Sequence, residues 1–270
     1  MITDRKIGFI GGGNMAEALI KGLIGGGVPA RELLIAEPMG ARRDFLQERY
    51  EVTVTDDNCA VTGACNAILL CIKPQTCNQA LQDIKGTVRQ DQLFISIMAG
   101  VKTEAIENSL GGAPRVVRVM PNTPALVMEG ASALCAGSHA TAADLSLARH
   151  IFDMVGKSWT VEEKLLDAVT GLSGSGPAYV LTFIEALSDA GVKNGLTREA
   201  ATGLAAQTVF GTAKLLLETR EHPAVLRDKV TSPGGTTIAG LVAMEKEGFR
   251  NAIITAVDAA TARSMELGKK

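Results

Sequence analysis

The segment that decides the fold lies near the N-terminus and is Lys6-Ile-Gly-Phe-Ile-Gly-Gly-Gly-Asn-Met-Ala16. Its short apolar run, Ile7–Ile10, predicts a buried strand, and Gly11-x-Gly13-x-x-Ala16 predicts the turn into a helix. The first glycine allows a tight turn, and the second lets a ligand approach the backbone. The N–H groups that open the helix have no partners within it, so they can bind phosphate oxygens. The segment therefore predicts a dinucleotide-binding unit; the alternative is a glycine-rich turn that binds nothing.

The composition is that of a globular chain with a sizeable core. The chain has 270 residues, 46% of them hydrophobic, and a net charge of −2. That charge gives no electrostatic reason to expect nucleic acid or an anionic membrane as a partner. No apolar stretch approaches the length of a membrane-spanning helix, and the first strand begins too early to leave room for a signal peptide. We therefore expect a cytoplasmic protein that binds neither nucleic acid nor membrane.

The cysteines do not form a metal-binding motif. Cys59, Cys65, Cys71 and Cys77 are spaced six residues apart, but no Cys-x-x-Cys pair occurs. Cys71 lies in an apolar run, where a thiol acts as a small hydrophobic group. We expect structural or incidental thiols in a reducing compartment, and no metal site.

Strand-like and helix-like segments alternate through the first 160 residues. The strands expected after the first are Leu33–Ala36, Val52–Thr55, Ala67–Ile72, Leu93–Met98, Arg115–Met120 and Ala131–Ala136. Helices are expected between them, including one that Thr103 caps and one from Thr141 to Val155. This alternation predicts a doubly wound parallel sheet, in which ligands bind at the carboxyl ends of the strands. Residues 11–16, 37–43, 73–74 and 121–124 follow such ends.

A region of helices alone is expected to begin near Thr160. Thr160-Val-Glu-Glu163 has the pattern of a capping box that opens a helix, and no strand is expected beyond it. Helical periodicity covers residues 160–170, 177–194, 197–220, 223–229, 236–247 and 249–267. We expect an N-terminal Rossmann-type domain over residues 1–160 and an all-α domain over residues 161–270.

Charged residues after the second strand bear on the choice of cofactor. Glu37 stands where a carboxylate accepts hydrogen bonds from the adenosine ribose, which favours NAD. Arg42 and Arg43 follow it and have two possible roles. They can bind a 2′-phosphate, which favours NADP, or lie solvated on the first turn of a helix. The sequence leaves both cofactors open.

Two glycine-rich segments interrupt the helical region, and the first is Gly171-Leu-Ser-Gly-Ser-Gly-Pro-Ala-Tyr179. Three glycines before Pro177 indicate either backbone packed against another group or a tight turn between helices. The β-hydroxyacid dehydrogenases have a related segment followed by a catalytic lysine, but that position is Val180 here. Valine cannot donate a proton, so this alternative lacks its catalytic group.

The second segment, Thr231-Ser-Pro-Gly-Gly-Thr-Thr-Ile238, opens a helix. The N–H groups of residues 234–237 can surround an anion, and the hydroxyls of Ser232, Thr236 and Thr237 add donors. A small carboxylate fits such a site. The alternative is an ordinary N-cap in which Ser232 or Thr236 satisfies the free N–H groups.

Candidate proton donors are few. The histidines are His139, His150 and His222, and none adjoins a glycine-rich segment. Reduction of a ketone requires a proton for a strongly basic alkoxide, whereas an imine nitrogen can arrive already protonated. A hydroxyl donor is then sufficient, so imine reduction is the easier chemistry for this chain.

Together these segments resemble the pyrroline-5-carboxylate reductases over essentially the whole chain. The similar motifs are Gly8–Met15, Lys73-Pro74, Asn122-Thr-Pro124, Gly171–Tyr179 and Ser232–Ile238. The resemblance implies NAD(P)H-dependent reduction of 1-pyrroline-5-carboxylate to L-proline, the last step of proline biosynthesis. It also implies a Rossmann domain followed by a helical domain that forms homodimers, which often assemble into rings, with an active site completed by the partner subunit.

The resemblance also implies roles for individual residues. Those expected at NADPH or NADH are Ile10, Gly11, Gly12, Gly13, Asn14, Met15, Asn58, Cys71, Ile72, Lys73, Pro74 and Ala99. Those expected at the substrate carboxylate are Ser232, Gly235 and Thr236. Thr237 would donate to the ring nitrogen as the catalytic residue, and Glu163 would lie near the substrate.

Two positions depart from the family pattern. Lys229 stands where some relatives have Asn near the nicotinamide, and Glu37 stands where some have small or hydroxyl residues. Two other functions stay open: a reductase of a related cyclic imine or small 2-oxo acid, and a nucleotide-binding regulator without catalysis. The intact segment of residues 231–237 argues against a regulator, which has no evident need for a second site.

Overall fold

The computed structural model describes residues 5–268, which form two compact units. Unit 1 contains the chain up to Ser175 and the segment from Ala259 onward, and unit 2 is Gly176–Asp258. The chain thus leaves unit 1 once and returns to it near the C-terminus. The domain boundary expected between residues 160 and 161 stays a prediction.

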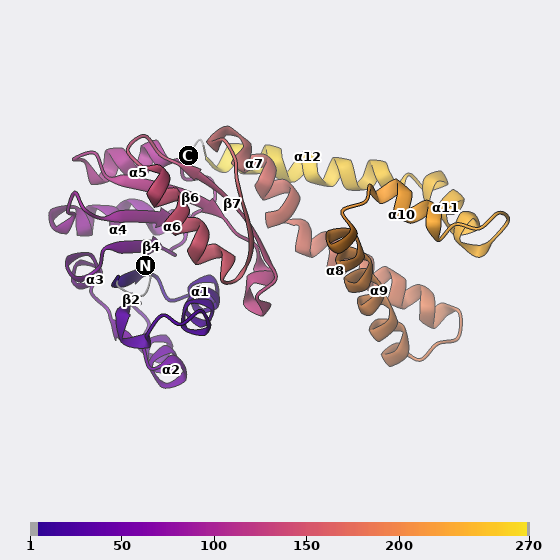
Figure 1. Cartoon of the computed structure of the whole chain (residues 1–270), viewed down its shortest axis with the longest axis horizontal. Helices are drawn as coiled ribbons and strands as arrows, with labels where there is room; N and C mark the ends of the chain where they lie inside the picture. The colour runs from indigo at the N-terminus through magenta and orange to yellow at the C-terminus, as the bar shows by residue number, and fades with distance from the viewer. Residues whose placement is uncertain (1–4, 269–270) are drawn as a thin grey trace. The chain divides into compact units, whose positions relative to one another are not determined.

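Unit 1 is built on an eight-stranded sheet whose order is β3-β2-β1-β4-β5-β6-β7-β8 (Figure 1). The strands are β1 Ile7–Ile10, β2 Leu33–Ala36, β3 Thr53–Thr55, β4 Ala67–Leu70, β5 Leu93–Ser96, β6 Arg115–Met120, β7 Gly130–Ala136 and β8 Gly156–Thr160. β1 to β6 are parallel, β7 pairs antiparallel with β6, and β8 is parallel to β7. The strand order reverses between β1 and β4, which confirms the doubly wound Rossmann-type sheet and places its crevice there.

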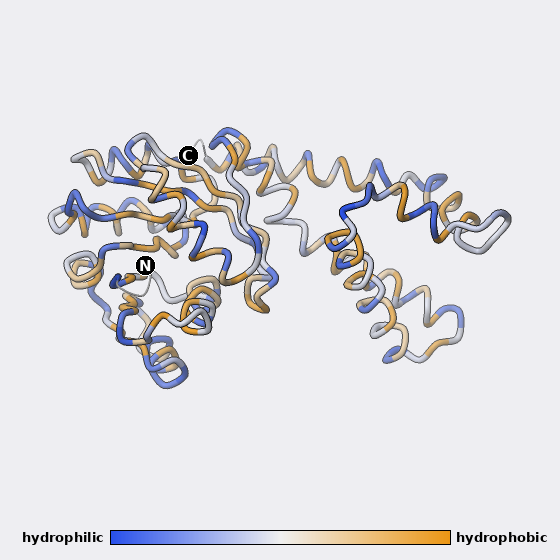
Figure 2. The backbone as a smooth tube through the Cα atoms, viewed as in Figure 1, coloured by the Kyte–Doolittle hydropathy of each residue, from blue (hydrophilic) through white to orange (hydrophobic). Residues whose placement is uncertain are grey.

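Helices cover both faces of this sheet. On one face α1 (Asn14–Gly25), α2 (Gly40–Tyr50) and α6 (Ala142–Asp153) enclose a core that includes Phe9 and Phe152. On the other, α3 (Asn58–Ala64), α4 (Cys77–Ile84) and α5 (Thr103–Leu110) enclose a core that includes Ile68 and Phe94. Hydrophobic residues run along the strands between them (Figure 2). A strand buried on both faces needs such a continuous apolar run, which is why the sequence identified these strands.

The capping box expected at Thr160 is wrong, and a strand that ends at this residue was not expected, whereas the described residues after it form helices and turns only, as expected. Residues 156–160 form β8, in which Thr160 pairs with Leu134 of β7. The segment Gly-Lys-Ser-Trp-Thr has no apolar alternation, because β8 is an edge strand with exposed side chains. A side chain at Gly156 would collide with the backbone of Gly130, so the close pairing of these strands requires glycine.

The helix expected over residues 160–170 is divided into shorter pieces. They are a 3-10 turn η6 (Glu163–Leu165), α7 (Leu166–Val169) and a π-helical turn η7 (Thr170–Gly174). A Cβ on Gly174 would lie 2.7 Å from the terminal methyl of Met120. Crowding of the backbone, one of the two interpretations of the glycine-rich segment, therefore applies at this position.

Unit 2 consists of helices that bury little of their own apolar surface. They are α8 (Gly176–Lys193), α9 (Arg198–Thr219), α10 (Pro223–Lys229), α11 (Thr236–Lys246) and most of α12 (Phe249–Leu267). Leu217 is 72% exposed and Leu181 is 66% exposed, and hydrophobic residues line these helices (Figure 2). Exposed apolar area of this extent indicates a surface that binds a partner.

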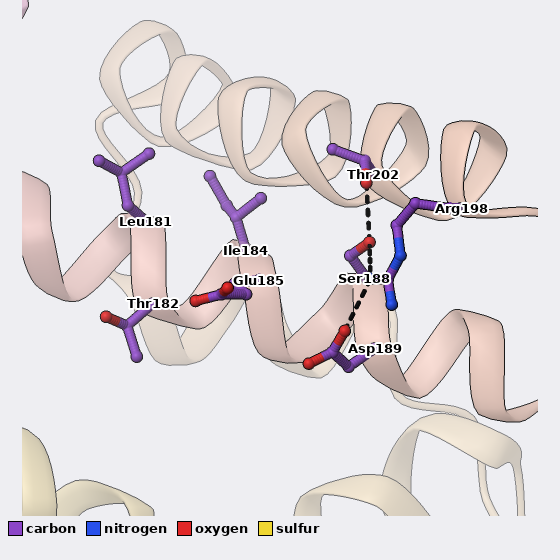
Figure 3. A pocket seen from close by; sticks show the side chains of 8 residues that line it. All are labelled: Leu181, Thr182, Ile184, Glu185, Ser188, Asp189, Arg198 and Thr202. Atoms are coloured by element: carbon purple, nitrogen blue, oxygen red, sulfur yellow. Dashed lines mark hydrogen bonds and ion pairs between the residues drawn. The ribbon is translucent and has the colours of Figure 1, made fainter.

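Polar contacts hold α8 against α9 in unit 2 (Figure 3). The Ser188 hydroxyl lies 2.8 Å from that of Thr202 and accepts a hydrogen bond of 2.8 Å from Arg198, which also pairs with Asp189 at 2.7 Å. These contacts align α8 with α9. Within residues 5–268, no helix has the length and apolar character needed to cross a membrane.

Candidate active site

The loops after β1, β4 and β5 lie next to one another at the carboxyl edge of the sheet. Backbone hydrogen bonds join them to neighbouring strands: Cys71 N–H to the Ile10 carbonyl at 2.8 Å, and Ile97 N–H to the Leu70 carbonyl at 3.2 Å. Gly11 has φ +97°, and a Cβ there would lie 2.5 Å from the Cys71 carbonyl oxygen. Only glycine fits at position 11, because the loop after β1 lies so close to the loop after β4.

The glycine loop after β1 leaves a helix N-terminus accessible. Gly13 is the N-cap of α1, is exposed, and has no heavy atom within 4 Å of the position a Cβ would take. The N–H groups of Asn14 and Met15, at the start of α1, lack partners within the helix. This arrangement fits the pyrophosphate of a dinucleotide.

The carboxylate of Glu37 is bound to the backbone of the glycine loop. Its two oxygens accept hydrogen bonds from Gly12 N–H at 2.9 Å and from Met39 N–H at 3.0 Å. Glu37 follows β2 and is buried. The sequence suggested a ribose ligand at this position, and it gave no sign of the contact with Gly12.

Arg42 and Arg43 are not simply solvated on the first turn of α2. Arg42 Nε donates to the Gly12 carbonyl at 2.6 Å, and Arg42 Nη2 donates to Glu17 at 2.6 Å. Arg43 Nη1 donates to the Glu37 carbonyl at 2.7 Å. Both side chains therefore pack back toward β2 and the glycine loop, and a contact with a 2′-phosphate stays a prediction.

The other residues expected at the cofactor lie at the same edge of the sheet. Asn58 opens α3 after β3, and Ala99 is half-buried in the loop after β5. Cys71, Ile72, Lys73 and Pro74 follow β4. Burial raises the pKa of the Cys71 thiol, so it stays protonated and serves as a small apolar group.

The loop of residues 231–235 in unit 2 ends in an N-terminus that no side chain caps. Gly235 is the N-cap of α11, and its N–H donates to the Ser232 carbonyl at 3.1 Å. Gly234 has φ +65°, and the Ser232 hydroxyl occupies the position that a Cβ on Gly235 would take. The alternative of an ordinary cap by Ser232 or Thr236 is therefore wrong, and the N–H groups of Thr236 and Thr237 remain available to a ligand.

Glu163 has partners that the sequence did not reveal. Its carboxylate accepts hydrogen bonds from the N–H and hydroxyl of Thr103, both at 2.8 Å, and from Arg118 at 3.3 Å. Thr103 was expected to cap α5, but it is the first residue of that helix, and Lys102 is the N-cap.

The negative charge of Glu163 also affects a neighbouring thiol. Burial, together with this charge, raises the pKa of the Cys135 thiol to about 11. Arg118, a charged residue in the middle of the apolar strand β6, was the one signal that could have found this cluster.

Three further motif residues have structural partners. Asn122 accepts a hydrogen bond from Ala131 N–H at 2.8 Å and donates one to the Ser173 carbonyl at 3.1 Å. Lys229 pairs with both carboxylate oxygens of Glu221 at 2.7 Å. His222 is exposed and caps α10 by accepting a hydrogen bond from Ala224 N–H through Nδ1.

The parallel sheet, its glycine loop and the open N-terminus of α1 define a dinucleotide-binding oxidoreductase of the Rossmann class. Residues 6–100 match the family model described as NADP oxidoreductase, coenzyme F420-dependent. Residues 163–267 match the model described as pyrroline-5-carboxylate reductase dimerisation, so the helical region is one that self-associates.

Full-length similarity to named proteins identifies the family. The pyrroline-5-carboxylate reductase of a Synechocystis species is 50% identical, over 98% of this chain and 99% of that protein. The solved reductase of Coxiella burnetii has a TM-score of 0.93 at 38% identity, covering 97% and 98% of the two chains. That of Plasmodium falciparum, solved with NADP bound, has a TM-score of 0.88 at 33% identity, covering 98% and 99%. The chain belongs to the pyrroline-5-carboxylate reductase family. This confirms the resemblance and the expectation of an NAD(P)H-dependent oxidoreductase that acts on a C=N bond.

Proposed function

We propose that the protein uses NADPH or NADH to reduce the C=N bond of 1-pyrroline-5-carboxylate, which yields L-proline in the last step of proline biosynthesis. One structural observation supports this proposal in addition to family membership. The loop before α11 presents free backbone donors and hydroxyls where no side chain caps the helix. An anion of carboxylate size matches those donors.

The cofactor is proposed to lie along the carboxyl edge of the sheet in unit 1. The pyrophosphate contacts Ile10–Met15, and the adenosine ribose contacts Asn58, with Glu37 close to the glycine loop. Cys71, Ile72, Lys73, Pro74 and Ala99 line the remainder of the cleft. Glycines at the crowded turn and the accessible N-terminus of α1 support this placement.

The substrate is proposed to bind through its carboxylate at the start of α11. Ser232, Gly235 and Thr236 hold the carboxylate oxygens, which the positive end of the helix dipole stabilises. Direct contact of Glu163 with the substrate stays a prediction, because its carboxylate accepts three hydrogen bonds within unit 1.

Thr237 is proposed to act on the imine nitrogen. The bound nicotinamide supplies the hydride that the imine carbon receives. Thr237, half-buried in the first turn of α11, donates its hydroxyl proton to a hydrogen bond at the nitrogen or directs a water there. The protein contributes mainly by positioning, an effect that supplies about 7–11 kcal/mol in well-oriented systems.

Assembly and location complete the proposal. The dimers associate further into rings, and the partner subunit completes each active site. The chain is organised as a Rossmann domain over residues 1–160 and a helical domain over residues 161–270, and it works in the cytoplasm. The half-buried or buried state of the five free thiols is compatible with a reducing compartment.

An assay of NADPH and NADH oxidation with 1-pyrroline-5-carboxylate, a piperideine carboxylate and small 2-oxo acids tests the proposal. We expect the highest kcat/KM with 1-pyrroline-5-carboxylate. A higher value with another substrate would favour a related reductase. Tight dinucleotide binding without oxidation of any substrate would favour a regulator.

A further inference from the structure

The carboxylate of Glu163 joins three segments of unit 1 that are far apart in the sequence. One oxygen accepts a hydrogen bond from the backbone N–H of Thr103, and the other accepts one from its hydroxyl, both at 2.8 Å. Arg118 in β6 donates to the first oxygen at 3.3 Å. Glu163 thus connects η6, the start of α5 and the interior of the sheet.

Both partners require an acceptor or a negative charge at this position. The first N–H groups of α5 have no partner within the helix, and the side chain of its N-cap, Lys102, contains no acceptor. A carboxylate at a helix N-terminus also interacts favourably with the helix dipole. Arg118 is 3% exposed, and a buried guanidinium needs a paired charge. Glu163 meets both requirements.

The loop of residues 97–102 leads directly into this contact. At its start, Ile97 N–H is hydrogen-bonded to β4 at 3.2 Å. In its middle, Gly100 has φ +76° and lies against Gly268, since a Cβ on Gly100 would be 3.3 Å from the Gly268 nitrogen. At its end, Thr103 is bound to Glu163. The loop is therefore fixed at both ends and packed in between.

We propose that Glu163 is a positioning residue that acts through Thr103 and Arg118 to hold the loop of residues 97–102 in the form that accepts the cofactor. This rests on the proposed function, which places Ala99 of the loop in the cofactor cleft. Without the carboxylate, the start of α5 loses its acceptor, and the loop populates other conformations. The loss therefore falls on dinucleotide affinity.

Titration of the full-length protein with NADPH, followed by nucleotide fluorescence, tests this proposal. Glu163→Gln keeps the size of the side chain and removes its charge, and Thr103→Val removes only the hydroxyl. We expect each to raise the Kd for NADPH about fivefold, and the double variant to raise it by less than the product, because both act through one network. Thr103→Ser, which keeps the hydroxyl, restores the wild-type Kd.

Direct contact of Glu163 with the substrate predicts a different result. Glu163→Gln would then raise the KM for 1-pyrroline-5-carboxylate and leave the Kd for NADPH at the wild-type value. Thr103→Val would likewise leave the Kd for NADPH unchanged. That outcome overturns the proposal. Nucleotide titration needs no substrate, so it tests the loop even if the reductase assay fails. Thr103→Val leaves the pair of Glu163 and Arg118 in place, so this variant tests the proposal by itself if Glu163→Gln folds poorly.

Discussion

The amide of Gly12 donates a hydrogen bond of 2.9 Å to a carboxylate oxygen of Glu37, 25 residues later in the chain. The carbonyl of Gly12 accepts a hydrogen bond of 2.6 Å from Arg42. Both polar backbone groups of this glycine are therefore fixed by side chains from the segment after β2. Glu37 consequently shapes the glycine loop in addition to placing a negative charge beside it.

Replacement of Glu37 should change cofactor preference. Glu37→Ser removes the charge that disfavours a 2′-phosphate, and we expect the NADPH/NADH ratio of kcat/KM to rise about tenfold, equal to ~1.4 kcal/mol. It should also weaken binding of both cofactors, because Gly12 N–H loses its acceptor. Glu37→Gln is the control that removes the charge and keeps an acceptor. A ratio that stays constant in both variants would refute the electrostatic role.

Loss of Arg42 should affect both cofactors alike. Its guanidinium binds the Gly12 carbonyl and Glu17, so Arg42→Gln loosens the glycine loop. We expect KM for NADPH and for NADH to rise by similar factors of about three to ten, which lies within the range measured for coupled neighbouring contacts. Arg43→Gln is the matched control from the same helix turn. A loss confined to NADPH would show that Arg42 contacts the 2′-phosphate.

Thr237 is the test of the chemical step. Thr237→Val removes the hydroxyl without changing the shape of the side chain, and we expect kcat to fall about 100-fold, as for loss of a positioned proton donor. The Kd for NADPH should hold, because Thr237 lies in the first turn of α11 and not in the glycine loop. Thr237→Ser should recover most of the activity. Unchanged turnover in the valine variant would remove Thr237 from the mechanism.

A methyl group on Gly235 should damage substrate binding. The Ser232 hydroxyl occupies the space that the new Cβ needs, so Gly235→Ala displaces a proposed carboxylate donor. We expect KM for 1-pyrroline-5-carboxylate to rise about tenfold, equal to ~1.4 kcal/mol, at constant Kd for NADPH. Gly240→Ala on the same helix has open space around its Cβ position and is the control. Equal KM values in the two variants would contradict the carboxylate site.

The pH dependence of stability should report on Glu17. Burial raises the pKa of this carboxyl, but hydrogen bonds from Arg42 and Tyr50 outweigh burial and lower it below 4.5. A lowered pKa in the folded state adds stability above the unfolded value, and that stability is lost as the pH falls through the folded value. Glu17→Gln should cost about 0.5–1 kcal/mol at neutral pH.

Denaturant unfolding of the wild type and Glu17→Gln over a pH series measures this contribution. The difference in free energy of unfolding should shrink as the pH falls below 4.5, the ordinary pKa of the group. A difference that persists undiminished in acid would mean that packing, and not charge, accounts for the effect.

The sequence by itself determined the alternation of strands and helices, the glycine loop after β1 and the two glycine-rich segments of the helical region. Each is encoded within a window of a few residues. Apolar runs specify buried strands, 3.6-residue periodicity specifies helices, and glycine marks backbone that a Cβ would obstruct. For that reason β6 and α12 have the predicted bounds, whereas edge strand β8, which has no apolar run, was missed.

Only the tertiary structure decided which partners the charged side chains have. Glu37 binds Gly12, Arg42 binds Glu17, and Glu163 binds Thr103 across 60 residues. Such pairs depend on the order and register of the strands, which bring segments that are distant in the sequence next to one another. A local pattern specifies where a carboxylate stands in the chain, but the folded backbone determines which donors it meets.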